Sequence, residues 1–342
     1  MSDAASRIAA HRARLGKRLA VLAHHYQVDA VVAQADLVGD SLELARHIPG
    51  LAAEHVVFCG VHFMAESAAI LAKPGQKVHI PDVHARCTMA DMAPGRRVAQ
   101  VLDTLIRRGR RVVPLAYVNS CAEVKAVCGR HGGSVCTSAN AGRMLEWAMG
   151  QGEGVLFLPD KHLARNTADA LGIPPDRRHI LDVRGAGDRV DEAAAATADL
   201  LIWPGACSIH HTFRPEHVTA VRAQHPGVSV VVHPECRPEV VRSADAAGST
   251  SYIIRFVREA LPGGTVAIGT EINLVLRLAA EYAGVKRILP LAVRPCANMA
   301  RITEAKLLAQ LDSLEQSPPV TVPPDIAEPA RVALTRMLDV CG

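Results

Sequence analysis

The sequence predicts an α/β protein made of three Rossmann-like domains, each with a parallel sheet built from βαβ units. Two observations lead to this prediction. β-rich runs alternate with amphipathic helical patterns along the chain, as they do where helices connect parallel strands. The alternation also occurs three times in the same order, and each copy closes on a cysteine in a polar loop, at Cys87, Cys207 and Cys296. We therefore expect three related domains around a pseudo-threefold centre.

Each copy begins with a strand-like run that ends in polar residues, at residues 20–27, 112–120 and 229–235. A segment bearing hydroxyl groups follows and opens a helical pattern, and then come a second β-rich run, a turn and another helix. A last β-rich piece precedes the cysteine, and these three pieces are KVHIPD, ADLLIWPG and RILPLAV. Because ligands of open α/β sheets bind beyond the carboxyl ends of the strands, the polar strand ends are candidate site residues.

The repeats also predict the domain boundaries. We expect a first domain at residues 1–96, a second at 97–208 and a third at 209–297, with residues 298–342 packing back on the first domain. The segment EQSPPVTVPPDIAEPA is rich in proline and is typical of an extended connector, which leads into a final helical pattern, ARVALTRMLDV.

Composition narrows the class of protein. The 342 residues are 49% hydrophobic and 21% charged, which is ordinary for a globular chain with a core. A net charge of +4 with only 3% aromatic residues argues against nucleic-acid binding. The sequence has no apolar signal-peptide core and no run of membrane-spanning length, so we expect a cytoplasmic protein without membrane contact. Nine cysteines, an odd number, then favour reduced thiols and metal ligation over disulfides.

The cysteines differ in their surroundings. Cys59 and Cys136 lie in apolar runs and are expected to be buried small hydrophobes, and Cys121 is expected to be a tolerated small side chain. The three cysteines that close the repeats lie in polar or Pro/Gly-marked loops, where one metal cluster could collect them. No CxxC spacing supports metal binding, so ordinary loop thiols remain the alternative. The chain also has no GxGxxG, Walker or HExxH motif, which argues against nucleotide and zinc sites.

The strand ends and helix starts supply candidates for acid–base chemistry and anion binding. Histidine exchanges protons near neutral pH, whereas tyrosine and glutamate need shifted pKa values to do so. Hydroxyl groups at helix starts can bind an anion, although the same residues also serve as ordinary helix caps. The candidates at the strand ends are His24, Tyr26, Tyr117, Asn119, His233 and Glu235, and those at the helix starts are Ser41, Ser138 and Thr250.

A series of collinear motifs resembles the quinolinate synthase family. They run from about Leu22 to Ile302 in that family's order and are too numerous for coincidence. The motifs are LAHHYQ, GDSLELAR, VFCGVHFMAES, PDVHARCTMADM, YVNSCAEVKA, VCTSANA, PDKHLARNTA, WPGACSIHH, VVHPECRPEVV, GSTSYIIRFV, IGTEINLVLRL and PCANM.

The resemblance implies three homologous domains in a triangle around one [4Fe-4S] cluster. It implies a transferase that condenses iminosuccinate with dihydroxyacetone phosphate to quinolinate, phosphate and water, in de novo NAD biosynthesis. The cluster ligands would be Cys87, Cys207 and Cys296, one from each domain. Three thiolates on four irons leave one iron open, which would act as a Lewis acid.

The resemblance also suggests roles for the site residues. Glu235 would be the base, Tyr26 the acid or base nearest the departing phosphate, and His24 with His233 would bind carboxylates or shuttle protons. Substrate would also contact Ser41, Tyr117, Asn119, Ser138, His210 and Thr250. Because iminosuccinate hydrolyses readily, an aspartate oxidase or aspartate dehydrogenase is a candidate transient partner. Two rival interpretations are a hydro-lyase with the same open-iron chemistry and a non-catalytic iron–sulfur sensor.

Overall fold

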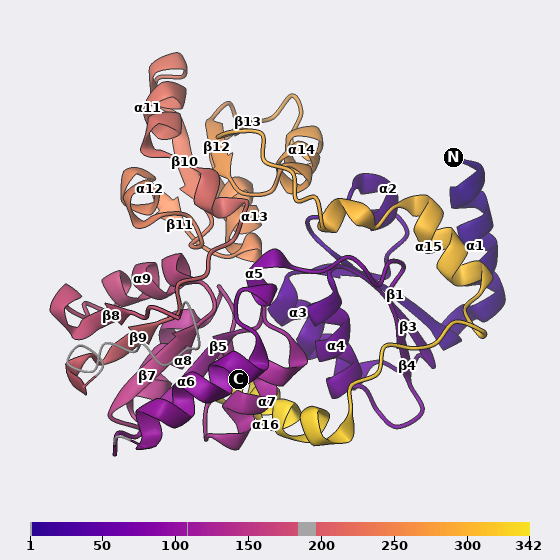
Figure 1. The fold of residues 1–342 in the computed structure, drawn as a ribbon. Helices are drawn as coiled ribbons and strands as arrows, with labels where there is room; N and C mark the ends of the chain where they lie inside the picture. The colour runs from indigo at the N-terminus through magenta and orange to yellow at the C-terminus, as the bar shows by residue number, and fades with distance from the viewer. Residues whose placement is uncertain (1, 108, 184–195) are drawn as a thin grey trace. The chain divides into compact units, whose positions relative to one another are not determined.

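The computed structural model describes residues 2–107, 109–183 and 196–342 and contains three parallel sheets connected by helices (Figure 1). The predicted α/β class is confirmed. By their contacts, the residues divide into two compact units. The first comprises Met1–Cys87, Thr219–Val231 and Thr250–Val322, and the second comprises Thr88–Val218, Val232–Ser249 and Pro323–Gly342. The three domain boundaries expected from the repeats stay a prediction.

The first sheet has the strand order β2-β1-β3-β4. Its central strand β1 is buried at all six residues and pairs in parallel with β2 and β3. The strands are β1 (Leu19–His24), β2 (Leu37–Gly39), β3 (His55–Cys59) and β4 (Lys77–His79), and the helices are α1 (Asp3–Leu15), α2 (Asp29–Val32), α3 (Ser41–His47), α4 (His62–Leu71) and α5 (Thr88–Asp91).

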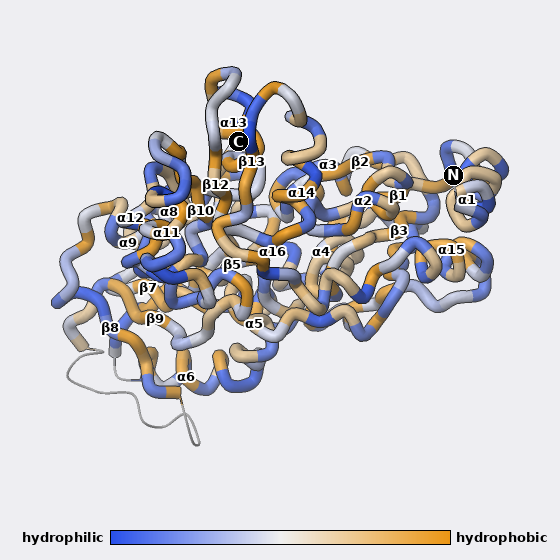
Figure 2. The backbone as a smooth tube through the Cα atoms, turned by 90° about the horizontal axis from the view of Figure 1, so that it is seen from above, coloured by the Kyte–Doolittle hydropathy of each residue, from blue (hydrophilic) through white to orange (hydrophobic). Residues whose placement is uncertain are grey.

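The second sheet has the order β6-β5-β7-β9-β8. Its first four strands repeat the topology of the first sheet, and β8 adds a parallel edge strand that the sequence analysis did not predict. Figure 2 shows that β5, β7 and β9 are hydrophobic, as expected for strands covered on both faces. The elements are α6 (Gly95–Arg107), β5 (Val112–Tyr117), α7 (Ala122–Arg130), β6 (Ser134–Cys136), α8 (Ala141–Met149), β7 (Gly154–Leu158), α9 (Lys161–Ala170), β8 (Arg178–Ile180) and β9 (Leu200–Ile202).

The third sheet repeats the same order as β11-β10-β12-β13. The last β-rich pieces that the sequence analysis placed before each cysteine are therefore β4, β9 and β13. The elements are α11 (Pro215–Gln224), β10 (Ser229–Val232), α12 (Pro238–Ser243), β11 (Ala246–Ala247), α13 (Thr250–Glu259), β12 (Thr265–Gly269), α14 (Ile272–Glu281) and β13 (Arg287–Pro290).

Two further helices complete the chain, α15 (Glu304–Asp312) and α16 (Pro324–Cys341). Helix α15 contacts α1, where Asp312 pairs with Arg7 at 2.9 Å and with His11 at 2.8 Å. Helix α16 packs against α7 and β6. It begins at Pro324, earlier than the sequence pattern indicated, because proline is well tolerated in the first turn of a helix.

Local sequence explains where several helices begin. Asp40 and Glu43 form a reciprocal capping box at the start of α3. Asp160 caps α9 and Glu271 caps α14, each through a side-chain carboxylate that accepts backbone N–H groups of the first turn. Among the described residues, no helix is both long enough and apolar enough to cross a bilayer.

Candidate functional site

The three cysteines that close the repeats have equivalent backbone surroundings. In each copy, the helix after the third strand begins with a residue whose N–H donates to the carbonyl two positions before the cysteine. His62 of α4 donates to Ala85, which precedes Cys87, at 2.7 Å. Lys161 of α9 donates to Gly205, and Ile272 of α14 donates to Arg294, at 2.9 and 3.2 Å.

Each of these cysteines also stands immediately before a helical turn. Cys87 directly precedes α5, and the carbonyls of Cys207 and Cys296 accept the N–H groups of His211 and Ala300, at 3.0 and 2.9 Å. The three thiols are half-buried. The loop cysteines therefore share one local fold in three copies.

Five of the other six cysteines are poor candidates for ligation because metal binding requires a thiolate. Burial raises the pKa of Cys59 and of Cys128 to about 12. It also raises the pKa of Cys136 and of Cys236 well above the usual value. Cys121, the N-cap residue of α7, has a pKa raised to about 11, mainly by burial.

A buried acid–base cluster lies beside Cys207. Glu235 Oε2 is 2.8 Å from Nδ1 of His210 and 3.1 Å from Nδ1 of His233. The two imidazole rings stack, with centroids 4.3 Å apart. All three side chains are at most 3% exposed. Potential ligand atoms of Cys207, His210 and Glu235 lie within 4.8 Å of one another, so the three could together hold a metal.

The histidines control the charge of this cluster. Burial by itself disfavours the ionised form of Glu235, but the charge of His210, together with the close contacts of His210 and His233, outweighs burial and lowers the pKa of Glu235 below its ordinary value. Glu235 Oε1 is buried without a hydrogen-bond partner among the described residues. An ionised carboxylate whose second oxygen has no hydrogen-bond partner is available to bind a ligand.

A second group of predicted residues meets at the end of β1. The hydroxyl of Tyr26 is 2.7 Å from Oγ1 of Thr270 and 3.4 Å from Oγ1 of Thr250. The rings of Tyr26 and His24 contact edge to face at 4.6 Å. Backbone N–H of Tyr26 donates to Nδ1 of His24, so the proton of a neutral His24 is on Nε2. Tyr26 and Thr250 therefore belong to one hydrogen-bonded chain of hydroxyl groups.

Two of the three hydroxyl-bearing segments come together in the first unit. Ser41 is the first residue of α3 and Thr250 is the first residue of α13. Ser251 donates its hydroxyl to Asp40, the cap of α3, at 2.9 Å. The helix starts that carry Ser41 and Thr250 are thus directly linked.

The third segment differs from the sequence interpretation. Ser138 does not open a helix, because α8 begins only at Ala141. The side-chain oxygen of Asn140 accepts the N–H of Thr137 at 2.6 Å and closes a turn around Ser138. Local side-chain bonds of this kind compete with helix formation.

The remaining predicted residues follow β5. Tyr117 is the last residue of that strand and is 4% exposed. Asn119 lies two residues further on, and its Oδ1 is buried without a hydrogen-bond partner among the described residues. A buried amide oxygen without a partner is costly, so it is suited to accept a hydrogen bond from a ligand.

The sequence analysis missed a histidine pair that the structure brings together. Arg237 donates to Nε2 of His211 at 2.9 Å, and Nδ1 of His211 is 2.8 Å from Nε2 of His162. Arginine can only donate, so the proton of His211 must be on Nδ1 and that of His162 on its own Nδ1. Burial is the main cause that lowers the pKa of both, to about 3 for His162, so both are neutral. In the sequence, the only indication of this pair was that His211 directly follows His210.

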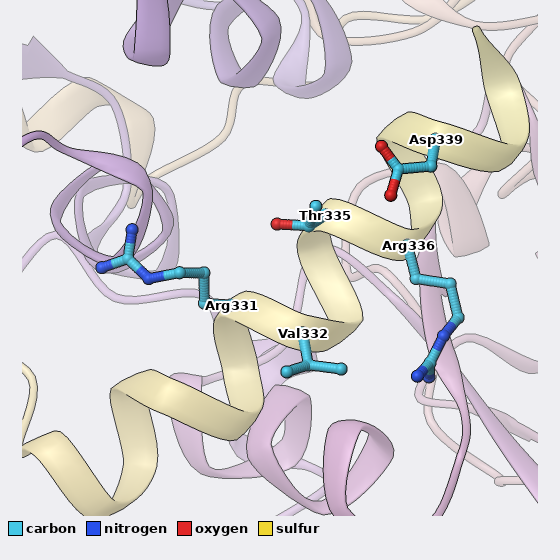
Figure 3. A pocket seen from close by; sticks show the side chains of 5 residues that line it. All are labelled: Arg331, Val332, Thr335, Arg336 and Asp339. Carbon is cyan, nitrogen blue, oxygen red and sulfur yellow. The ribbon is translucent and has the colours of Figure 1, made fainter.

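The described surface also has a hollow of about 350 Å³ on α16. Figure 3 shows that its side chains all project from this one helix. It includes none of the predicted site residues, and we assign it no role. Its lining is Arg331, Val332, Thr335, Arg336 and Asp339.

Comparison with known proteins agrees with the resemblance seen in the motifs. The family model described as quinolinate synthetase A protein matches residues 6–339. A quinolinate synthase from Acidobacterium capsulatum is 48% identical over 98% of this chain and 92% of its own length. Those from Geobacillus kaustophilus and Streptomyces coelicolor are 46% and 45% identical, over 99% and 98% of this chain and 94% and 88% of their own lengths. Nearly the whole chain takes part in each match, and the chain belongs to the quinolinate synthetase A family.

Proposed function

We propose that this protein is a transferase that condenses iminosuccinate with dihydroxyacetone phosphate to give quinolinate, phosphate and water, as a step of de novo NAD biosynthesis. The observation that carries the proposal is the buried Glu235 between His210 and His233, beside Cys207. The reaction requires a base next to a metal centre. Because the chain belongs to the quinolinate synthetase A family, quinolinate is the expected product.

The donor set fits an iron–sulfur cluster. Thiolates are the usual ligands of such clusters, and three half-buried cysteines occupy the same backbone setting at Cys87, Cys207 and Cys296. We assign these three as the ligands of one [4Fe-4S] cluster. When bound, a cluster with three protein ligands supplies an open iron that acts as a Lewis acid towards substrate oxygens.

Side chains of the protein carry out the acid–base chemistry. Glu235, kept ionised by its two histidines, takes the carbon-bound proton that must leave during tautomerisation, and His233 relays it. Tyr26, in the hydroxyl chain between Thr250 and Thr270, gives a proton to the oxygen of the leaving phosphate. His24, with a proton on Nε2, binds a substrate carboxylate.

Binding residues position the two substrates. Hydroxyl groups of Ser41, Ser138 and Thr250 donate to the phosphate, and backbone N–H groups at the starts of α3 and α13 add to its stabilisation. Tyr117 and Asn119 contact iminosuccinate, for which the buried Oδ1 of Asn119 is an acceptor. An aspartate oxidase or aspartate dehydrogenase that hands over iminosuccinate would protect it from hydrolysis.

The test is an anaerobic assay of cluster-reconstituted protein with dihydroxyacetone phosphate and freshly generated iminosuccinate. We expect quinolinate from the wild type and from Cys341→Ser, the control, and neither cluster nor quinolinate from Cys87→Ala, Cys207→Ala or Cys296→Ala. Wild-type protein with a four-iron cluster but no product would overturn the substrate assignment and favour a hydro-lyase. Variants that keep cluster and activity would overturn the ligand assignment.

A further inference from the structure

Asp160 is a fully buried carboxylate that joins a helix start to a cysteine loop. One oxygen, Oδ1, accepts the N–H groups of His162 and Leu163 in the first turn of α9, at 2.8 and 2.7 Å. The other oxygen, Oδ2, accepts the backbone N–H of Cys207 at 2.9 Å. The carboxylate thus divides its two oxygens between the helix and the cysteine.

Glu271 makes the same connection in the third repeat. It is also fully buried and caps α14, where Oε2 accepts the N–H of Asn273 at 2.8 Å. Its Oε1 accepts the backbone N–H of Cys296 at 3.2 Å and also the side-chain amide of Asn273 at 3.3 Å. An aspartate and a glutamate therefore perform one geometric task at corresponding positions of two repeats.

The residue after each carboxylate completes the connection. The backbone N–H groups of Lys161 and Ile272 donate to the carbonyls two residues before Cys207 and Cys296. Two successive residues at each helix start therefore bind the carbonyl and the N–H that flank the residue before the cysteine. Gly205 lets the loop approach closely, because an added Cβ would lie 2.5 Å from the carbonyl oxygen of Pro159. We call this arrangement the carboxylate clamp.

Helix capping alone does not account for a buried carboxylate. Serine or threonine caps a helix about as well and avoids the cost of burying a carboxyl group. A carboxylate offers two acceptor oxygens, and each clamp has two sets of N–H donors facing in different directions. The second oxygen is therefore explained by the cysteine loop that it holds.

We propose that Asp160 and Glu271 are positioning residues that hold Cys207 and Cys296 in place, before metal arrives, as preorganised ligands of the cluster. This inference rests on the proposed function for the identity of the metal group. It is confined to these two cysteines, because the corresponding cap position before α4 is Val61, whose side chain is not an acceptor.

The test uses Asp160→Asn and Glu271→Gln. An amide of the same shape keeps one oxygen for the helix, and asparagine is a good helix cap. Its other end is an NH₂ donor, which faces a backbone N–H that can only donate. Each substitution therefore breaks the hydrogen bond to the cysteine N–H without removing side-chain volume.

Two measurements do not depend on catalysis. In metal-free protein, we expect hydrogen exchange at the Cys207 amide in Asp160→Asn, and at the Cys296 amide in Glu271→Gln, to be about tenfold faster or more, the effect of breaking one buried hydrogen bond and leaving its donor unpaired. In reconstituted protein, we expect faster loss of iron to a chelator and an altered electron paramagnetic resonance spectrum of the reduced cluster. Each variant should affect its own cysteine alone.

The control is Thr303→Ala, which removes the side-chain cap of α15, a hydrogen bond that goes to Lys306 and not to a cysteine loop. It should lower the melting temperature, yet leave hydrogen exchange at the Cys207 and Cys296 amides and the rate of iron loss as in the wild type. Unchanged exchange in both carboxylate variants would overturn the proposal. If reconstituted wild type held no cluster, the proposed function would fall, whereas the exchange rates of metal-free protein would still decide whether the clamp exists.

Discussion

At the scale of single residues, the site depends on carboxylates whose charge is governed by their neighbours. Glu235 is fully buried, and an isolated carboxylate there would be neutral. Two histidines in contact with the same oxygen reverse that preference. Glu235 therefore stays ionised although it is buried, so its carboxylate is in the form that the proposed role as a base requires.

We therefore expect Glu235→Gln to lower the rate of quinolinate formation about a hundredfold or more, the usual effect of removing a general base. The amide preserves the size of the side chain, so the cluster content should change little. Glu239→Gln, an exposed change in the same segment, should leave the rate unaltered. A rate within a fewfold of the wild type for Glu235→Gln would rule out the proposed role.

A different histidine pair links stability to pH. Nδ1 of His55 is 3.2 Å from Nε2 of His79, and both side chains are 1% exposed. Burial is the main cause that lowers the pKa of His79 to about 4, and the charges of His55 and Lys77 lower it further. Burial likewise lowers the pKa of His55, against the opposing charge of Glu54.

Because the folded pKa of His79 lies below its ordinary value, the unfolded chain binds the proton more readily than the folded chain. The free energy of unfolding should therefore fall as the pH decreases from about 6.5 to about 4 and be regained above that window. Urea unfolding at a series of pH values measures this. His79→Gln should flatten the dependence, whereas His47→Gln, at an exposed position, should keep it. An equal slope in His79→Gln would contradict the assignment.

At the scale of elements, α16 depends on a close contact with α7. Pro329 lies inside α16 and has no N–H to give to the carbonyl of Asp325. The guanidinium of Arg130, at the end of α7, donates to that carbonyl instead. Beside it, a Cβ added to Gly129 would lie 1.8 Å from the carbonyl oxygen of Pro329. The two helices can approach this closely only because residue 129 is glycine.

Gly129→Ala should accordingly destabilise the protein, by about 1–3 kcal/mol or more, because backbone rather than a flexible side chain must move. Gly142→Ala is the matched control, since Gly142 lies in α8 and an added Cβ there meets nothing within 4 Å. That change should be neutral or stabilise by about 0.4–1 kcal/mol. Equal free energies of unfolding for the two variants would mean that α16 does not require the close contact.

At the scale of the whole molecule, one topology occurs three times. The orders β2-β1-β3-β4, β6-β5-β7-β9 and β11-β10-β12-β13 are the same pattern, and all four strands of the third sheet are labelled in Figure 1. The sequence repeats predicted this architecture because alternating strand and helix patterns leave few topologies open. The edge strand β8 was not predicted, because a run of three partly exposed residues is too short to show the alternation of apolar and polar residues that marks a strand.

The sequence by itself determined the α/β class, the three repeats and the family, and it singled out Cys87, Cys207 and Cys296 among nine cysteines as candidate ligands. Patterns and motifs are local in the chain, so they can be seen without coordinates. Only the tertiary structure decided how Glu235 meets His210 and His233, that Tyr26 reaches Thr250 and Thr270, and that Asp160 and Glu271 bind cysteine loops. These contacts join residues far apart in the chain, and their pKa values and hydrogen bonds depend on burial that only folding creates.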